Sequence, residues 1–267
     1  MRIVFWNIRA GGGVRVDRIA RQLKRWRPAI AVLCEFRATP PSCELAGLLA
    51  SAGFVHQRAT TSADQPARNG LLVASRLPVR RLHVRHAPLE HGRWLLVRVA
   101  AAEPFALGAM HIPNYATGRK GAFHDSVGEL ASRWRGGPAL LVGDTNSGYP
   151  GIDEETRVFG PGETRFLDTL ARADWVDAYR HIHGQRTAFT WYSPNGDNGF
   201  RLDQAFVNPP LLPRLRRAAY EWPGGRRRGL SDHAAMIVDL AEPSGDSAEL
   251  ERAADEICSE GPRRADA

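Results

Sequence analysis

Short apolar runs alternate with amphipathic stretches along most of this chain, and this alternation limits the folds open to it. The apolar runs are typical of buried strands, whereas apolar residues spaced three and four positions apart predict helices. The predicted helices are residues 15–26, 43–53, 119–134 and 164–175. The predicted strands are residues 2–8, 29–36, 70–76, 93–100, 104–112, 139–144, 201–208, 217–222 and 234–240.

Some of these strands alternate with helices, and others follow one another directly. This mixture favours an α/β protein with mixed sheets over a purely parallel, doubly wound one. With 267 residues, 43% of them hydrophobic, the chain can bury a full core as one large domain or two small ones. Because no linker divides residues 1–241, we expect one domain there. Residues 242–267 are rich in small and acidic residues, which predicts a disordered tail or a short peripheral helix.

The chain shows no sign of membrane insertion or of a disulfide framework. No run reaches the roughly 18 apolar residues that a membrane span needs, and the first residues form an alternating strand rather than a leader. The three cysteines, Cys34, Cys43 and Cys258, show no CxxC spacing, and Cys34 is most simply a buried strand residue. We therefore expect a cytoplasmic monomer.

Six apolar runs each carry an acid, an amide or an imidazole within the run or at its end. These residues are Asn7, Glu35, His111, Asp144 with Asn146, Asp203, and Asp232 with His233. Any one of them could be an ordinary turn or helix cap. Burying Glu35 and Asp203 without polar partners would destabilise the fold, so a shared polar cluster explains the whole set better.

The composition of this cluster indicates its chemistry. Carboxylates and an amide, with no cysteine among them, are hard oxygen ligands that suit Mg²⁺ or Mn²⁺ better than zinc. The two histidines can donate a hydrogen bond or a proton to a phosphate oxygen. The cluster therefore predicts a hydrolase of phosphodiesters or phosphomonoesters.

Charge points to a polyanionic partner. The tail holds eight acidic and three basic residues, which leaves 33 basic and 21 acidic residues before Glu242. A domain this basic favours nucleic acid, although frequent arginine codons in a GC-rich genome would give the same count. Ser231 precedes Asp232 and His233, but adjacency in the chain is not the geometry of a catalytic triad.

The cluster and its order along the chain resemble the endonuclease/exonuclease/phosphatase superfamily. The resemblance runs from "FWNIR" to "LSDHAAMIVDL" and covers nearly all of residues 1–241. It implies a four-layer α/β/β/α sandwich, in which two mixed sheets pack face to face and helices cover their outer faces. It also implies hydrolysis at one Mg²⁺ or Mn²⁺ by in-line attack of water.

The resemblance also assigns roles to individual residues. It makes Glu35 the direct metal ligand, with Asn7 and Asp232 beside the metal. It places His111 at the scissile phosphate, and it makes Asp144 and Asn146 the pair that activates water. Asp203 and His233 match a hydrogen-bonded pair of the family.

Departures from the family pattern bear on the substrate. His111 stands where abasic endonucleases usually have Tyr, and a His at this position is similar to deoxyribonuclease I and the sphingomyelinases. Arg9 stands where the abasic endonucleases have an acid. In contrast, "HIPN" and "FTWYSPNGDNGFRLD" are similar to abasic endonucleases, which makes Asn114 and Trp191 candidate substrate contacts, although Trp191 could equally be a core residue. Three consecutive arginines before the catalytic histidine suit contacts with backbone phosphates. They are Arg226, Arg227 and Arg228.

We therefore expect a DNA-cleaving phosphodiesterase with a role in DNA repair. Two alternatives remain. One is a phosphatase or phospholipase of the same superfamily, and the other is a catalytically silent protein that binds nucleic acid through the same basic face.

Overall fold

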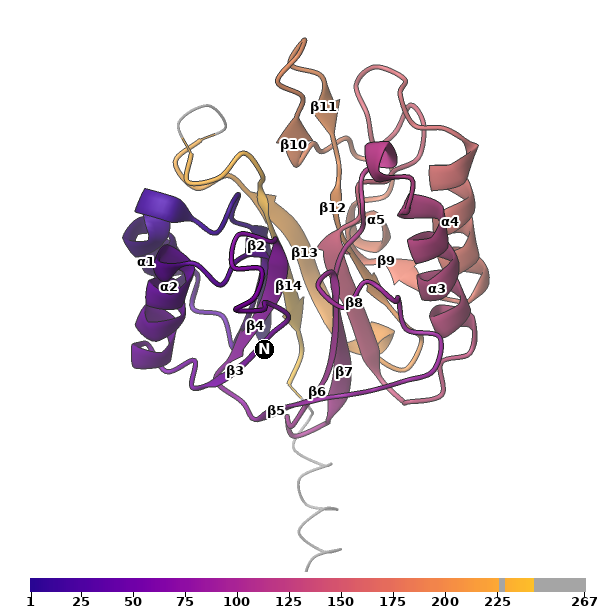
Figure 1. Ribbon diagram of the computed structural model, residues 1–267. Helices are drawn as coiled ribbons and strands as arrows, with labels where there is room; N and C mark the ends of the chain where they lie inside the picture. Colours follow the sequence, from indigo (N-terminus) through magenta and orange to yellow (C-terminus); the bar gives the residue numbers. More distant parts are fainter. Residues whose placement is uncertain (226–228, 243–267) are drawn as a thin grey trace, which may run out of the picture.

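The computed structural model describes residues 1–225 and 229–242, and two six-stranded sheets form its centre (Figure 1). The first sheet has the order β13-β14-β1-β2-β4-β3, and the second has the order β5-β6-β7-β8-β12-β9. The strands of the first sheet are β1 (Arg2–Asn7), β2 (Ile30–Phe36), β3 (His56–Ala59), β4 (Gly70–Ser75), β13 (Leu215–Glu221) and β14 (Ala235–Leu240). Those of the second are β5 (Val79–Arg81), β6 (Trp94–Val99), β7 (Phe105–His111), β8 (Ala139–Asp144), β9 (Val176–Asp177) and β12 (Asp203–Val207). A separate small hairpin pairs β10 (Trp191–Tyr192) with β11 (Gly199–Phe200).

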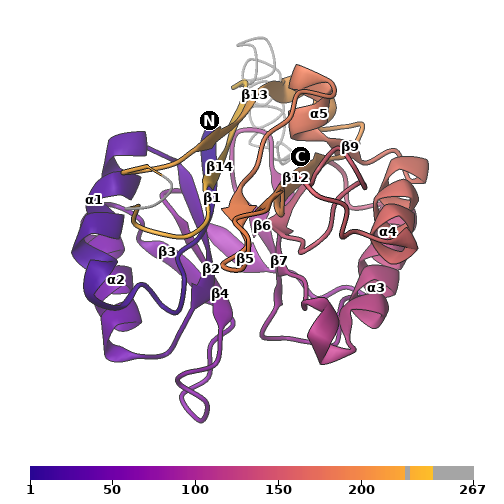
Figure 2. The ribbon, with the colours of Figure 1, turned by 90° about the horizontal axis from the view of Figure 1, so that it is seen from above.

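Helices cover the outer faces of both sheets. They are α1 (Val16–Trp26), α2 (Pro40–Ser51), α3 (Lys120–Ser132) and α4 (Pro161–Arg172). The short helix α5 (Ala178–His183) instead contacts β12 and β13 and adds Ala178 and Tyr179 to the core between the sheets. Short 3-10 turns are η1 (Gly13–Arg15), η2 (Tyr115–Thr117) and η3 (Leu212–Arg214). Seen from above, α1 and α2 lie outside the first sheet and α3 and α4 outside the second (Figure 2). The layers are therefore α/β/β/α, as the resemblance implied.

The apolar pattern of the strands explains this layering. Ile3 and Phe5 of β1 point into the core between the sheets, whereas Val4 and Trp6 point into the core beneath α1 and α2. Successive side chains of a strand face opposite sides, so a strand covered on both sides reads as a continuous apolar run. Burial of a large apolar side chain contributes roughly 1.5–3 kcal/mol, which makes these strands the main source of stability.

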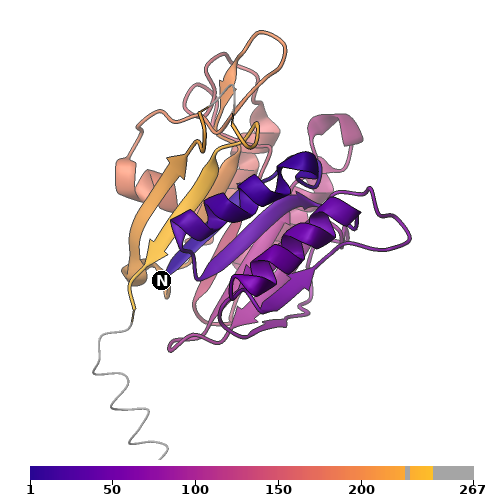
Figure 3. The ribbon, with the colours of Figure 1, turned by 90° about the vertical axis from the view of Figure 1, so that its left-hand side faces the viewer.

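The connectivity makes the sheets mixed. β1 pairs with β2 in parallel and β7 with β8 in parallel, while the other pairs within the two sheets are antiparallel. The chain completes the second sheet and then returns to the first, where β14 pairs with β1. The view from the side of α1 and α2 shows the two returning strands beside the N-terminus (Figure 3).

Most predicted elements are present, with differences at ends and edges. Two predicted helices begin three residues earlier than expected, at Pro40 and Pro161, because proline is readily accommodated in the first turn of a helix. The short edge strands β3, β5 and β9 were not predicted, since they lack an apolar run of useful length. None of the helices among the described residues is long and apolar enough to cross a membrane. The predicted tail from residue 243 onward and Arg226, Arg227 and Arg228 lie outside the described residues.

Candidate active site

Three of the predicted polar residues form one row across the second sheet. His111 of β7 is paired in register with Asp144 of β8, and Asp144 is paired with Asp203 of β12. β7 and β8 run parallel and end at the same edge, where the antiparallel β12 begins. The row is buried, with exposed fractions of 7% for His111, 3% for Asp144 and 0% for Asp203.

A close backbone approach holds two members of this row together. Gly143 lies opposite Met110 in the parallel pair, and a Cβ on Gly143 would lie 2.1 Å from the Met110 carbonyl oxygen. No side chain fits there without displacing a strand. Gly143 therefore brings Asp144 and His111, the residues that follow this pair, into close register.

His233 lies just before β14 of the first sheet and adds a fourth polar residue to the row. Its Nδ1 lies 2.9 Å from Oδ2 of Asp203, and its Nε2 lies 4.0 Å from Oδ2 of Asp144. Burial by itself lowers the pKa of an imidazole, but the charge and hydrogen bond of Asp203 outweigh it and raise the pKa of His233 to about 9. His233 is therefore held as an imidazolium whose Nδ1 donates to Asp203.

A second layer of polar contacts positions Asp203. The hydroxyl of Tyr220 donates to the Asp203 carbonyl oxygen at 2.7 Å and accepts from Nη1 of Arg201 at 3.3 Å. Arg201 is completely buried and is paired with Asp153 at 2.7 Å and Asp177 at 2.6 Å. Removing one member of such a buried pair is costly, so this network fixes the start of β12.

Glu35 is presented by an irregular backbone on the facing sheet. Its φ is +58°, in the left-handed region, and the register of β2 against β4 shifts between Cys34 and Phe36. Backbone N–H groups of the glycine-rich turn donate to it, from Ala10 to Oε2 at 2.7 Å and from Gly11 to the carbonyl oxygen at 2.8 Å. Strain of this kind in a non-glycine residue is retained mainly at functional sites.

Asn7 joins the two sheets. Its Nδ2 donates to Oδ2 of Asp144 at 3.1 Å and approaches Oε1 of Glu35 at 3.4 Å, while its Oδ1 accepts the Arg9 N–H at 3.0 Å. The amide thus stands between two carboxylates and separates them. An amide at the end of β1 can donate hydrogen bonds to the carboxylates, whereas a third ionised acid could not.

Asp144 lies at the centre of the cluster. Burial raises its pKa, the charge of His233 opposes that effect, and the net result is a pKa of about 7. Its Oδ1 accepts the backbone N–H of Asn146 at 3.1 Å, and the Asn146 side chain is fixed by donating to the Ile112 carbonyl oxygen at 2.8 Å. An acid that titrates near neutral pH suits a general base.

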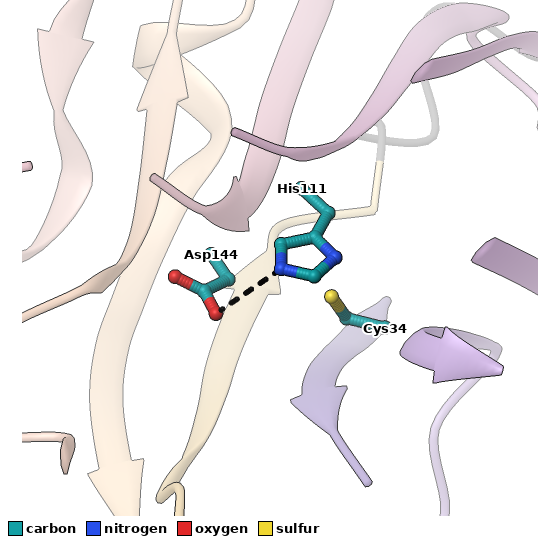
Figure 4. Close-up of side chains that lie close together, drawn as sticks. All are labelled: Cys34, His111 and Asp144. Atoms are coloured by element: carbon teal, nitrogen blue, oxygen red, sulfur yellow. Dashed lines mark ion pairs between the residues drawn. The ribbon is translucent and has the colours of Figure 1, made fainter. Parts of the chain in front are cut away.

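His111 has a different environment from His233. Burial lowers its pKa well below the usual range, and the charges of Arg93 and His233 add to the effect. Its Nε2 lies 3.9 Å from Oδ2 of Asp144, and its Nδ1 is buried without a hydrogen-bond partner. Figure 4 shows the ring beside Asp144 and Cys34. His111 is therefore a neutral imidazole.

The segment before β14 is tied to β1 through Ser231. The Ser231 hydroxyl donates to the Asn7 carbonyl oxygen at 2.6 Å and accepts the His233 N–H at 3.2 Å, which is a structural role rather than a nucleophilic one. Asp232 is more exposed, with Oδ2 3.8 Å from Nε of Arg9. Arg9 therefore stands beside a carboxylate that the resemblance places near the metal.

A cavity of about 370 Å³ opens beside this cluster. Its polar lining comprises Asn114, Asn146 and the ion pair of Lys120 with Glu163, and its apolar lining consists mainly of Phe159, Trp191, Phe200 and Leu202. Trp191 is only partly buried against the other three, so it belongs to both the apolar cluster and the cavity wall. The cavity is wide enough for a sugar or a base and joins an apolar wall to the polar row.

The residues present fit a hard divalent cation. A carboxylate oxygen of Glu35 lies 3.4 Å and one of Asp144 lies 3.1 Å from Nδ2 of Asn7, so hard oxygen ligands from both sheets converge here. Glu35 is only half-buried, so an ion bound to it could retain waters, as Mg²⁺ usually does. A divalent cation at this place would offset the repulsion between the neighbouring carboxylates.

Comparison with known proteins identifies the family. The sequence model of the Endonuclease/Exonuclease/phosphatase family matches residues 4–233. The chain belongs to this family. Its members are divalent-metal-dependent enzymes that act on phosphoesters.

Solved structures with the family fold cover most of the chain. A 3'-5' exonuclease from Neisseria meningitidis is 20% identical, with a TM-score of 0.74, and the match covers 90% of this chain and 99% of that one. An AP endonuclease from Archaeoglobus fulgidus is 19% identical, with a TM-score of 0.75 and the same coverage. A 3' phosphatase from Neisseria bound to a product DNA hairpin is 20% identical, with a TM-score of 0.73 and again the same coverage. These likenesses confirm the family fold.

The structure gathers most of the predicted site residues at one edge of the two sheets. They are Asn7, Glu35, His111, Asp144, Asn146, Asp203, Asp232 and His233. Sequence reasoning missed Phe159, Phe200 and Leu202 as cavity residues. Phe200 and Leu202 flank Arg201 in the "GFRLD" segment, so the family resemblance contained a signal for these two. Phe159 lies in a loop without any motif.

Proposed function

We propose that this protein is a Mg²⁺- or Mn²⁺-dependent hydrolase of phosphodiester bonds in DNA, with a role in DNA repair. The observation that carries the proposal is the site formed by residues of both sheets, where Asp144 lies between the Asn7 amide and the His233 imidazolium. Asp144, whose pKa is about 7, can act as a base, and the neighbouring His233 imidazolium, whose pKa is about 9, can stabilise a phosphate.

In the proposed mechanism, each residue has one task. Glu35 would hold the cation with support from Asn7 and Asp232, and the bound cation would supply positive charge to phosphate oxygens. Asp144, oriented by the Asn146 N–H, takes a proton from the attacking water. His233, oriented by Asp203, stabilises the charge that develops on the phosphate, and neutral His111 adds a hydrogen-bond donor.

The cavity supports a nucleotide substrate. Its apolar wall, including Trp191, suits a sugar or an unstacked base, and Asn114 can contact the flanking phosphate or sugar. The three arginines from Arg226 to Arg228 are proposed as contacts with backbone phosphates, although they lie outside the described residues. One relative in the comparison is bound to product DNA, which agrees with this substrate class. Cytoplasmic location and a monomeric state stay predictions from the sequence.

A side-by-side assay tests the proposal. The substrates are an abasic duplex, a recessed 3′ end, a 3′-phosphate end, supercoiled plasmid and a phosphoinositide, each with Mg²⁺, with Mn²⁺ or with EDTA. We expect hydrolysis of at least one DNA substrate, its loss in EDTA, and a fall of about a hundredfold or more in Asp144→Asn. Asp125→Asn, an exposed acid on α3, is the matched control and should leave the rate unchanged.

The other outcomes are equally informative. Hydrolysis of the phosphoinositide alone would replace the proposal by a phosphatase or phospholipase of the same family. DNA binding that persists in EDTA, with no hydrolysis of any substrate, would replace it by a silent nucleic-acid-binding protein.

A further inference from the structure

Cys34 lies against the active site but has no part in the proposed mechanism. It is the residue before Glu35 in β2, it is completely buried, and its side chain belongs to the core between the sheets. From the opposite sheet, His111 and Asp144 face it (Figure 4). One ligand atom of each, the Cys34 Sγ, a ring nitrogen of His111 and a carboxylate oxygen of Asp144, lie within 4.8 Å of one another.

These three side chains are the ligand types of a different metal from the proposed Mg²⁺. Thiolate, imidazole and carboxylate together suit zinc and similar thiophilic cations, whereas Mg²⁺ takes oxygen ligands and avoids thiolate.

The separations are close to those of a tetrahedral site. With metal–ligand bonds of about 2.0–2.3 Å, the ligand atoms around zinc lie roughly 3.3–3.6 Å apart. His111 Nε2 and Asp144 Oδ2 are 3.9 Å apart, and all three ligand atoms lie within 4.8 Å, so side-chain movements of about 1 Å close the site. His111 and Asp144 retain slight exposure at the open edge, which gives an ion access, with water as the fourth ligand.

We propose that Cys34, His111 and Asp144 form a second cation site, for zinc or another thiophilic divalent ion, and that its occupation inhibits the enzyme. The thiol releases one proton to solvent when the ion binds. Inhibition rests on the proposed function, in which Asp144 accepts a proton from water and His111 faces the phosphate. An ion on these two residues removes both from catalysis.

The site predicts an unusual pattern of competition. A zinc ion that merely displaced Mg²⁺ from Glu35 would be displaced in turn by excess Mg²⁺. Excess Mg²⁺ would not displace a zinc ion held by the Cys34 thiolate, because a hard cation does not compete for sulfur. Inhibition by zinc should therefore persist at saturating Mg²⁺.

Cobalt spectroscopy tests binding without any need for activity. The protein used is full-length Cys43→Ser/Cys258→Ser, which leaves Cys34 as its sole thiol. With saturating Mg²⁺ present to fill the Glu35 site, Co²⁺ should give a thiolate-to-cobalt charge-transfer band that reaches its plateau at one ion per chain and that zinc should abolish. The band should be absent in the same protein carrying Cys34→Ser, with Cys34→Ala as a second variant and circular dichroism to verify folding. Absence of the band in the parent, or its persistence in both folded Cys34 variants, would overturn the site.

Hydrolysis assays test inhibition. At saturating Mg²⁺, we expect Cys34→Ser to raise the zinc concentration for half-inhibition by more than about tenfold, since loss of a direct ligand should weaken binding at least as much as loss of an outer-shell partner. Cys43→Ser, which changes an exposed cysteine, is the matched control and should keep the parent sensitivity. Equal sensitivity in Cys34→Ser, with relief by Mg²⁺, would refute inhibition at this site. A cobalt band in a protein without hydrolytic activity would refute the proposed function and leave the site standing.

Discussion

Replacing Asp203 by asparagine separates the charge of this residue from its shape. The Asp203 carboxylate accepts from Nδ1 of His233 at 2.9 Å, and Asn keeps the size of the side chain while removing its charge. With that charge gone, burial is the largest remaining influence on His233 and disfavours an imidazolium, and only the charges of Asp144 and Asp232 oppose it. We expect the pKa of His233 to fall from about 9 to below its ordinary value of 6.5.

The magnitude follows from this difference. A shift from 6.5 to about 9 corresponds to roughly 3 kcal/mol in favour of the imidazolium. At pH 7.5, more than about nine-tenths of the wild-type molecules carry the charge, against less than about a tenth in Asp203→Asn. Because the folded pKa exceeds the unfolded one, His233 stabilises the fold fully below about pH 6.5, and this contribution is lost as the pH rises through 9.

Nuclear magnetic resonance titration of the imidazole protons in metal-free protein measures the change. His124 serves as an internal control, because its pKa is lowered to about 4 by burial and by Lys120, and Asp203 is not among the causes. Turnover should also fall on the order of a hundredfold at pH 7.5. A wild-type His233 that titrates at or below 6.5 would refute the reasoning, whatever the rate.

Three further perturbations probe other parts of the molecule. Gly143→Ala should destabilise the fold by about 1–3 kcal/mol, because its Cβ meets a backbone oxygen, whereas Gly121→Ala, in an open helical position, should be neutral or stabilising; thermal denaturation distinguishes them. His124 has a folded pKa of about 4, so stability should decline by up to about 3 kcal/mol as the pH falls from 6.5 towards 4, and His124→Gln should flatten this dependence in urea denaturation. Glu35→Gln should raise the Mg²⁺ concentration for half-maximal activity by about tenfold or more, and an unchanged metal dependence would remove Glu35 as the ligand.

The sequence predicted the central strands better than the edges of the sheets. Strands such as β8, covered on both faces, must be apolar along most of their length, so they can be recognised in the sequence without a structure. Edge strands such as β3, with the sequence HQRA, bury little and carry no comparable signal. Their pairing depends on β4 being already in place, which is a tertiary effect.

The same distinction applies to the site. Polar residues at strand ends stand out in the sequence because burying them alone is unfavourable, and this argument singled out Glu35 and Asp203. The proximity of Cys34 to His111 could not be predicted, because it depends on how closely the two sheets face each other. The pKa values of the two histidines likewise depend on partners brought together across the fold.

The return of the chain to the first sheet has a consequence for synthesis on the ribosome. β1 emerges first, yet its partner β14 and the preceding His233 come more than 220 residues later. Until then, β1 has one edge without its native partner, and an unpaired strand edge invites aggregation. A product that stops before β13 would therefore lack His233 and be prone to aggregate, so the candidate site forms only after β14 has been made.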